Sequence, residues 1–393
     1  MSKKIALVTC YFQPNYGSQL QAYATQMAFD KLGLENETIN IEGIKSEINK
    51  RKMKYFLSKI FDKNTILDKM ATVRKVVAKK RIPGLAENLS IRNKKFKEFE
   101  GLFRVSEIFD SIASIGEKSE SKYSAVVVGS DQLWLPSNIT ADYYTLNFVP
   151  KNICKIALAT SFGVSELPRK QAKMASHFLK RIDYVSVRED SGKKLIQRLA
   201  DRDVPVVCDP TLLFNSIEWN QISSKERFFD EKYIFVYFLG NNPEQRAYVK
   251  KVKELTGYKI VQLQHCDEYI KSDETFPDYT PYNVGPAEFI QLIRDAELVF
   301  TDSFHCSVFS ILNMKKFYTF RRYNNDSSVS TNGRLYSLLN KVDLSSRLLT
   351  ANEDPSITLK QEIDYSAVNK KVEDLRKFTW EWLTNSLKEA KIL

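Results

Sequence analysis

The sequence predicts an α/β protein with two doubly wound domains, each a parallel sheet covered by helices. The chain has 393 residues, and this length suits two domains of roughly 100–200 residues each. Short apolar segments alternate with amphipathic segments along most of the chain, which is typical of right-handed βαβ units. The alternation occurs in two series, and the strand pattern pauses between Asp209 and Trp219.

The first series begins with a buried strand at residues 5–10 and a helix at residues 18–32. The helix has apolar residues at helical spacing and is closed by Gly33. The same reasoning predicts helices at 169–179 and 190–199, and further strands at 124–128, 155–160, 184–188 and 204–208.

The second series predicts strands at 233–239, 259–264, 298–301 and 317–320, and helices at 243–255, 287–295 and 304–312. A last helix near 365–391 carries an apolar stripe and is long enough to pack back across the first domain. We therefore expect an N-terminal domain of residues 1–208, a C-terminal domain of residues 209–364 and a closing helix of residues 365–393.

Positive charge is concentrated in one segment. The chain has a formal net charge of +11, and residues 45–104 hold 18 Lys or Arg against 6 Asp or Glu. Apolar residues at roughly helical spacing predict two or three basic amphipathic helices inserted here into the first domain. They fit an ordinary solvated face, or a face that meets anionic lipid headgroups or a lipid-linked, pyrophosphate-bearing acceptor. Because no nucleic-acid-binding module accompanies the charge, we expect no nucleic-acid partner.

The five cysteines are scattered and show no C-x-x-C spacing, so we expect no zinc or dithiol site. They fit buried thiols in a reducing compartment. The N-terminus does not resemble a secretory signal, and no apolar stretch approaches ~18 residues. The expected location is the cytoplasm, with peripheral contact at the inner face of the membrane if the basic segment binds lipid.

Five polar segments follow predicted strands, where ligands bind in open α/β sheets. They cover residues 15–24, 128–134, 186–192, 209–213 and 301–310. Their order and spacing resemble the polysaccharide pyruvyl transferase family over nearly the whole chain. The resemblance implies two Rossmann-like domains facing a cleft, as in GT-B glycosyltransferases. It also implies transfer of a pyruvyl group from phosphoenolpyruvate to hydroxyls of a sugar, in a cell-surface polysaccharide or its lipid-linked precursor, to form a ketal.

This reaction asks for a proton donor and acceptor, guanidinium groups for the donor's carboxylate and phosphate, and N–H groups for the leaving phosphate. It needs no metal or organic cofactor; phosphoenolpyruvate is a co-substrate. His305, in the first turn of a helix capped by Asp302 or Ser303, is the preferred acid–base candidate over His265 and His177. The alternative is a hydrogen-bonded structural histidine.

Arg188 ends a predicted strand and is expected to act in catalysis by binding an anion, with a structural pair to Glu189 or Asp190 as the alternative. Many relatives carry an arginine two residues before the corresponding histidine, whereas this chain has Ser303. We expect Ser303 to lie at the binding site, and Arg334 or Arg347 to replace the missing guanidinium.

The first strand-to-helix loop is expected to contact the acceptor through Asn15, Gly17, Ser18 and Gln21. Gly17 permits close backbone approach, and Ser18 alternatively only caps the helix.

A second loop, Gly129, Ser130, Asp131 and Gln132, follows a buried strand. Asp131 is expected to orient or deprotonate an acceptor hydroxyl, or to cap the next helix. Three nearby aromatic residues are expected to stack on a sugar or to belong to the core: Trp134, Tyr143 and Tyr144.

The expected arrangement puts the acceptor on the first domain and the donor on the second. Two other functions stay open at this point. One is a GT-B glycosyltransferase that uses a nucleotide-sugar, and the other is a non-catalytic relative that binds glycan.

Overall fold

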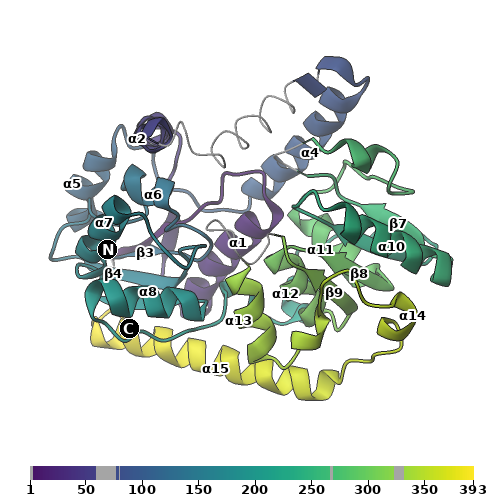
Figure 1. Ribbon diagram of the computed structural model, residues 1–393. Helices are drawn as coiled ribbons and strands as arrows, with labels where there is room; N and C mark the ends of the chain where they lie inside the picture. Colours follow the sequence, from purple (N-terminus) through teal and green to yellow (C-terminus); the bar gives the residue numbers. More distant parts are fainter. Residues whose placement is uncertain (1–2, 59–76, 79, 266–268, 323–331) are drawn as a thin grey trace.

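The computed structural model describes residues 3–58, 77–78, 80–265, 269–322 and 332–393. It contains two five-stranded parallel sheets, each flanked by helices, as the sequence predicts (Figure 1). Along the chain, the last strand of the first sheet is β5 (Tyr184–Val187) and the first strand of the second sheet is β6 (Tyr233–Tyr237). The domain limits at residues 208 and 364 stay predictions.

The first sheet has the order β2-β1-β3-β4-β5, with every neighbouring pair parallel. Its strands are β1 (Lys4–Val8), β2 (Asn36–Thr38), β3 (Tyr123–Val128), β4 (Cys154–Thr160) and β5 (Tyr184–Val187). The surrounding helices are α1 (Tyr16–Lys31), α5 (Ile112–Lys122), α6 (Pro136–Ala141), α7 (Arg169–Leu179) and α8 (Asp190–Ala200). Because helices cover both faces, most strand residues are apolar and buried.

The second sheet has the order β10-β9-β8-β6-β7, again all parallel. The strands after β6 are β7 (Lys259–Gln262), β8 (Leu298–Thr301), β9 (Lys316–Phe320) and β10 (Leu348–Leu349). Its main helices are α10 (Pro243–Thr256), α11 (Pro286–Asp295), α12 (Phe304–Leu312) and α13 (Gly333–Lys341). Several short helices lie in the connections: η1 (Pro210–Leu213), α9 (Ser216–Trp219), η2 (Lys271–Glu274), η3 (Ser345–Arg347) and α14 (Pro355–Thr358).

Both sheets follow the same winding. Counted along the chain, each has the order second, first, third, fourth, fifth strand. The crossovers therefore change direction between the first and third strands, β1 and β3 in one sheet and β6 and β8 in the other. Ligands bind beyond the carboxyl ends of the strands at such a switch point.

The predicted strand at 204–208 is not a regular strand. Only an isolated bridge joins Val206 to Val187, although Val187 donates to the carbonyl of Pro205 and Val207 donates back to Val187. Pro205 has no N–H to give, so the ladder cannot extend at this sheet edge.

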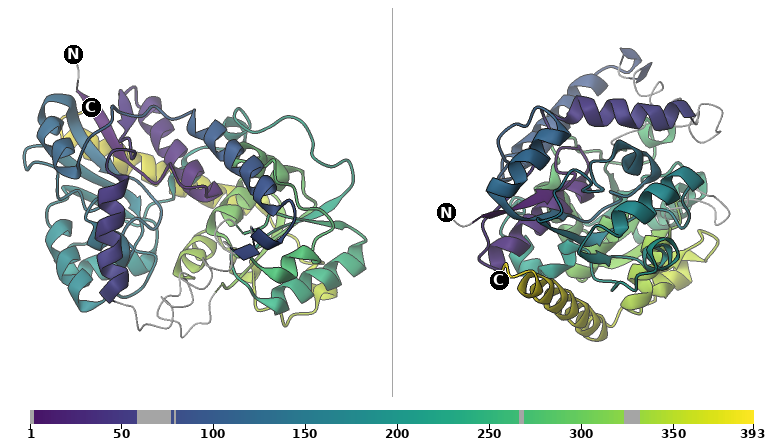
Figure 2. Two further views of the ribbon diagram at one scale, coloured as in Figure 1. Left: turned by 90° about the horizontal axis from the view of Figure 1, so that it is seen from above. Right: turned by 90° about the vertical axis from the view of Figure 1, so that its left-hand side faces the viewer.

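The basic insertion contains α2 (Lys45–Ser58) and α4 (Leu85–Glu100). The predicted apolar positions from 60 to 76 lie outside the described residues. Helix α4 reaches the second domain (Figure 2), where Arg92 donates to the carbonyl of Gln264 at 2.6 Å and Lys95 pairs with Glu288 at 2.8 Å. Part of the basic segment is therefore an interdomain contact, which corrects its interpretation as a solvated face throughout.

The last helix, α15 (Tyr365–Glu389), runs beneath both domains (Figure 1). Its Leu383 and Leu387 are fully buried in a cluster that includes Ile5 and Leu7 of β1. Among the helices of the described residues, none is long and apolar enough to cross a membrane.

Candidate active site

The two switch points face one another across a cavity of about 310 Å³. Its first-domain wall comes from the segments after β1 and β3 and from α2, and its second-domain wall from the segments after β6, β7, β8 and β9. The lining residues with chemical potential are Asn15, Ser18, Lys52, Asp131, Gln132, His265, Ser303, His305, Arg322 and Arg334.

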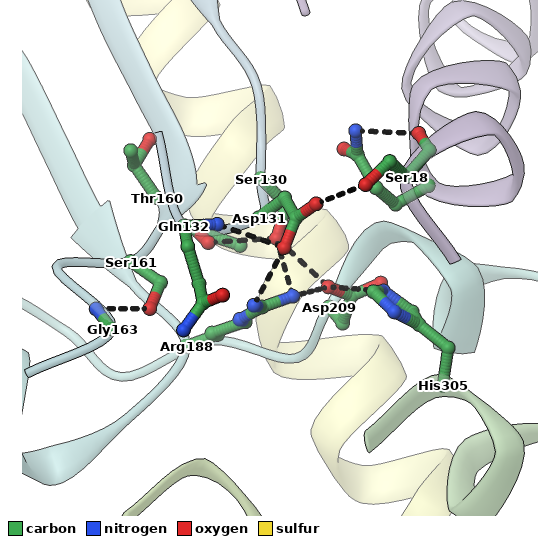
Figure 3. A network of polar contacts seen from close by, with 12 residues as sticks. Ser18, Ser130, Asp131, Gln132, Thr160, Ser161, Gly163, Arg188, Asp209 and His305 are labelled. Atoms are coloured by element: carbon green, nitrogen blue, oxygen red, sulfur yellow. Dashed lines mark hydrogen bonds and ion pairs between the residues drawn. The ribbon is translucent and has the colours of Figure 1, made fainter. Parts of the chain in front are cut away.

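The loop after β1 gives Ser18 to the site. Asn15 caps α1 by accepting from Ser18 N–H at 3.1 Å, so the alternative that Ser18 is the cap is wrong. The Ser18 hydroxyl instead donates to Asp131 Oδ2 at 2.6 Å (Figure 3). Gln21 donates to the carbonyl of Ser18 at 2.9 Å and does not line the cavity, so the structure does not place it where it can contact an acceptor.

Asp131 is held in an unusual backbone conformation. Its φ of 80° lies in the left-handed region, which an aspartate tolerates better than most residues. Its carbonyl accepts from Ser161 N–H at 3.0 Å, and Oδ1 accepts from Gln132 N–H at 2.8 Å. The next helix, α6, has Leu135 at its N-cap, so the capping alternative for Asp131 is wrong. The loop aims the carboxylate at the cavity.

Gly129 and Ser130 support this loop from behind the cavity wall. A Cβ at Gly129 would lie 2.9 Å from the Thr9 methyl group, so the glycine allows close approach. Ser130 donates to Asp209 Oδ2 at 2.8 Å. Neither residue lines the cavity, which favours a role in positioning other groups, and their assignment to substrate binding stays a prediction.

Arg188 is buried behind the cavity. Its guanidinium contacts Asp209 Oδ2 at 2.6 Å and Asp131 Oδ1 at 3.2 Å, and it lies 4.6 Å from the centroid of the Phe304 ring. It does not line the cavity, which favours a structural role, and the prediction that it binds the donor's anion stays a prediction. The structure agrees better with the structural alternative, although the main partners differ from the expected ones. Arg188 Nε lies 3.7 Å from Glu189, but the closest partners of the guanidinium are Asp209 and Asp131 (Figure 3).

His305 enters from the second domain in the first turn of α12. Ser303 is the N-cap, with Cys306 N–H donating to its hydroxyl at 3.5 Å, while Asp302 accepts from the N–H groups of Leu239 and Gly240. The imidazole Nε2 lies 3.6 Å from Asp209 Oδ2. The other side of the ring touches Gly17 so closely that a Cβ there would lie 2.0 Å from Nδ1.

These residues make one network across the cleft, from Ser18 through Asp131, Arg188 and Asp209 to His305 (Figure 3). The model of the family described as polysaccharide pyruvyl transferase matches residues 15–324, which include all five. The chain belongs to the polysaccharide pyruvyl transferase family.

Solved structures share the fold at low identity. A putative UDP-N-acetylglucosamine 2-epimerase from Listeria monocytogenes is 9% identical with a TM-score of 0.51, and the match covers 96% of this chain and 91% of that one. The UDP-GlcNAc 2-epimerase from Neisseria meningitidis bound to UDP-GlcNAc is 8% identical with a TM-score of 0.51, covering 98% and 100%. No curated protein matches the chain. The structural likeness supports the two-domain α/β fold alone.

Electrostatics in this pyruvyl transferase family member keep the carboxylates ionised. Burial by itself would raise the pKa of Asp209, but His305, Arg188 and Thr211 together hold it well below its usual range. Burial likewise opposes ionisation of Asp131, whose pKa is nevertheless lowered by Arg188, His305 and Ser18.

The second-domain wall is cationic. Arg334, in the first turn of α13, lines the cavity beside Phe304. Burial first, and then repulsion by Arg188, lowers the pKa of Arg334 to about 9, so a bound anion would stabilise this guanidinium. Arg322 and His265 line the same wall, and His265 Nε2 lies 2.7 Å from the carbonyl of Leu239.

The structure separates the two arginines that were expected to replace the missing guanidinium. Arg347 donates to the carbonyls of Gln361 and Glu362 at 3.2 and 2.6 Å and lines a different, smaller cavity. Of these two arginines, Arg334 lines the site and Arg347 does not, so the structure favours Arg334 for the predicted role. His177 lies on α7 and is exposed.

Sequence reasoning left Asp209, Lys52 and Arg322 without a site role. Asp209 lies in one of the five polar segments, which was the available signal, whereas Lys52 is one of 18 basic residues in its segment. Of the three aromatic candidates, Tyr144 lines the cavity, while Trp134 and Tyr143 are buried in the core. Within the described part of the chain, no group of three His, Cys, Asp or Glu side chains is placed to hold a metal.

Proposed function

We propose that this protein transfers a pyruvyl group from phosphoenolpyruvate to two hydroxyls of a sugar, forming a ketal. One observation carries the proposal beyond the family: His305 from one domain meets the Ser18–Asp131 pair of the other at a cavity with a cationic wall. An acid–base group, a hydroxyl-orienting carboxylate and anion-binding cations are the parts that this reaction requires.

The donor is proposed to bind the second-domain wall. Arg334 and Arg322 line it next to His305, and guanidinium groups suit both the carboxylate and the phosphate. The α12 N-terminus lies at the same place and favours negative charge.

In the proposed chemistry, His305 as imidazolium gives a proton to C3 of phosphoenolpyruvate, which leaves an oxocarbenium ion at C2. A sugar hydroxyl, oriented by Asp131, attacks C2, and its proton returns to the imidazole. The C2–O bond to phosphate then breaks, and a second hydroxyl closes the ketal while its proton leaves with inorganic phosphate. Asp209 and Gly17 hold the imidazole from two sides.

Replacing His305 by alanine tests the acid–base assignment. Loss of a general acid–base group lowers turnover by about 10²–10⁴-fold, so His305→Ala is expected to release phosphate from phosphoenolpyruvate that much more slowly. His177→Ala, at an exposed position on α7, is the control and should match the parent. Full activity in folded His305→Ala would rule out the assignment.

A thermal-shift panel of phosphoenolpyruvate, UDP, GDP and pyruvate separates this function from its alternatives. We expect stabilisation by phosphoenolpyruvate, because binding to the native state raises the melting temperature. Stabilisation by a nucleoside diphosphate and none by phosphoenolpyruvate would favour a nucleotide-sugar enzyme. Glycan binding without stabilisation by phosphoenolpyruvate and without phosphate release would favour a non-catalytic relative.

A further inference from the structure

Lys52 brings the basic insertion into the cleft. It lies on α2 and lines the first-domain wall of the cavity together with Cys10, Ser137 and Asn138. Two neighbouring lysines of the same helix, Lys50 and Lys54, are exposed to solvent. Lys52 thus differs from Lys50 and Lys54 in that it faces the cavity.

The backbone of α2 holds Lys52 in this position. Ile48 is buried in the main core cluster, and Arg51 donates to the carbonyl of Ala141 at the end of α6 and pairs with Glu47. These contacts fix the turn of the helix that carries Lys52. The ammonium group is therefore presented to the cavity by a packed element.

Within the described part of the chain, Lys52 forms no ion pair with a carboxylate. Burial lowers the pKa of Lys52, and the interaction with the Cys10 thiol opposes this effect only in part, because the partly buried cation loses hydration without gaining a carboxylate partner. An anion bound in the cavity would supply that partner.

The cationic side chains of the cavity are divided between its two walls. Of the described residues that line the cavity, Lys52, Arg322 and Arg334 are cationic and Asp131 is the one carboxylate. The two arginines lie on the second-domain wall with His305, where the donor's phosphate and carboxylate are proposed to bind. Lys52 is the cation of the opposite wall, on the side of Ser18 and Asp131.

We propose that Lys52 binds an anionic group of the acceptor, so that the enzyme selects sugars that carry a phosphate or a carboxylate. This inference rests on the proposed function, and it names the acceptor's chemical class. Lys52 acts in specificity and not in the bond-making steps.

The test compares three acceptor probes of one hexose at saturating phosphoenolpyruvate: the hexose 1-phosphate, the corresponding uronic acid and the neutral methyl glycoside. We expect the parent enzyme to prefer at least one anionic probe. Lys52→Gln should lower kcat/KM for that probe about tenfold or more beyond any loss on the neutral one, as expected for a lost charge-assisted hydrogen bond. The preferred probe distinguishes phosphate from carboxylate.

Two variants control the comparison. Lys52→Arg keeps the charge and should retain most of the preference, and Lys54→Gln removes an exposed charge from the same helix and should match the parent. A parent without preference, equal losses on charged and neutral probes in Lys52→Gln, or a rise confined to the KM for phosphoenolpyruvate would overturn the proposal.

Calorimetric titration of each variant with the hexose 1-phosphate and the uronic acid separates this inference from the proposed function. If the parent releases no phosphate from phosphoenolpyruvate, the proposed function fails, yet weaker binding of an anionic probe to Lys52→Gln than to Lys54→Gln still supports the lysine site. Equal binding to both variants removes it.

Discussion

At the scale of single residues, the contact between Gly17 and His305 fixes the position of the imidazole at the cavity. Gly17 lies in α1 of the first domain and His305 in α12 of the second, and only a residue without a Cβ fits between the helix backbone and the imidazole. The glycine is thus explained by close approach across the cleft and not by a special backbone angle.

We predict that Gly17→Ala displaces the imidazole and lowers kcat by more than tenfold. The added methyl group overpacks the contact, which costs about 1–3 kcal/mol, and the helix propensity of alanine offsets about 1 kcal/mol of this cost, so the melting temperature is expected to fall only modestly. Steady-state kinetics and calorimetric binding of phosphoenolpyruvate would separate lost turnover from lost binding. Gly101→Ala, at the end of α4, is the control. Unchanged kcat in Gly17→Ala would contradict the close packing.

Asp209 has a pKa lowered by His305 and Arg188, and this makes stability depend on pH. Its carboxylate stabilises the folded state fully above the unfolded pKa of about 4 and progressively less as pH falls toward the folded value. Asp209→Asn should be less stable by about 3 kcal/mol at pH 7, because Arg188 loses its closest buried partner. Urea unfolding at pH 7, 5 and 3.5 should show this difference narrowing below about pH 4. A difference that stays constant with pH would argue against an ionised Asp209.

At the scale of elements, α4 connects the domains with residues that the charge pattern alone places on a surface. Arg92 is 4% exposed and contacts both the carbonyl of Gln264 and the ring of Tyr282. The exposed cations of this segment, among them Lys50, Lys54, Lys80 and Arg81, leave contact with an anionic membrane as a prediction. Such membrane contact is expected to weaken as the salt concentration rises.

Replacing Arg92 by methionine tests the interdomain contact. We expect Arg92→Met to lower the free energy of unfolding by about 1.5–3 kcal/mol, the range for a hydrogen bond from a charged group. Lys94→Met alters an exposed position of the same helix and should change the free energy of unfolding by less than about 0.5 kcal/mol. Urea denaturation followed by tryptophan fluorescence measures both. Equal effects would mean that α4 contributes little to joining the domains.

At the scale of the whole molecule, α15 joins regions that are far apart in sequence. Arg376 donates to the carbonyl of Leu212, Thr379 accepts from Cys208 N–H, and Leu383 is buried against the first sheet. The helix therefore packs on the segment between the sheets as well as on the first domain.

Leu383→Ala is predicted to destabilise the protein by about 2–5 kcal/mol, because it removes apolar contacts and leaves a cavity. Phe378, on the same helix, is 47% exposed, and Phe378→Ala should cost much less. The midpoints of urea unfolding measure both effects. If Leu383→Ala matches Phe378→Ala, the helix is not part of the folding unit.

The sequence by itself determined the two parallel sheets, most helix and strand positions, and the family. These features depend on local periodicity and on polar segments in a fixed order, both of which can be read along one chain. It also placed Ser18, Asp131, Ser303 and His305 at strand-to-helix turns, where the winding of the sheets brings them to one cavity.

Only the tertiary structure decided which charged residues face that cavity. The sequence offers Arg188, Arg334 and Arg347 as similar candidates for binding an anion. In the structure, Arg188 is buried against two aspartates, Arg334 lines the cavity, and Arg347 donates to backbone carbonyls elsewhere. Asp209 gained its place from ion pairs with residues distant in sequence, and Lys52 gained its place from the packing of α2 against α6. The physical reason is that a charged side chain is positioned by whichever partners the packing of helices and sheets brings within a few ångströms, and no local pattern records those partners.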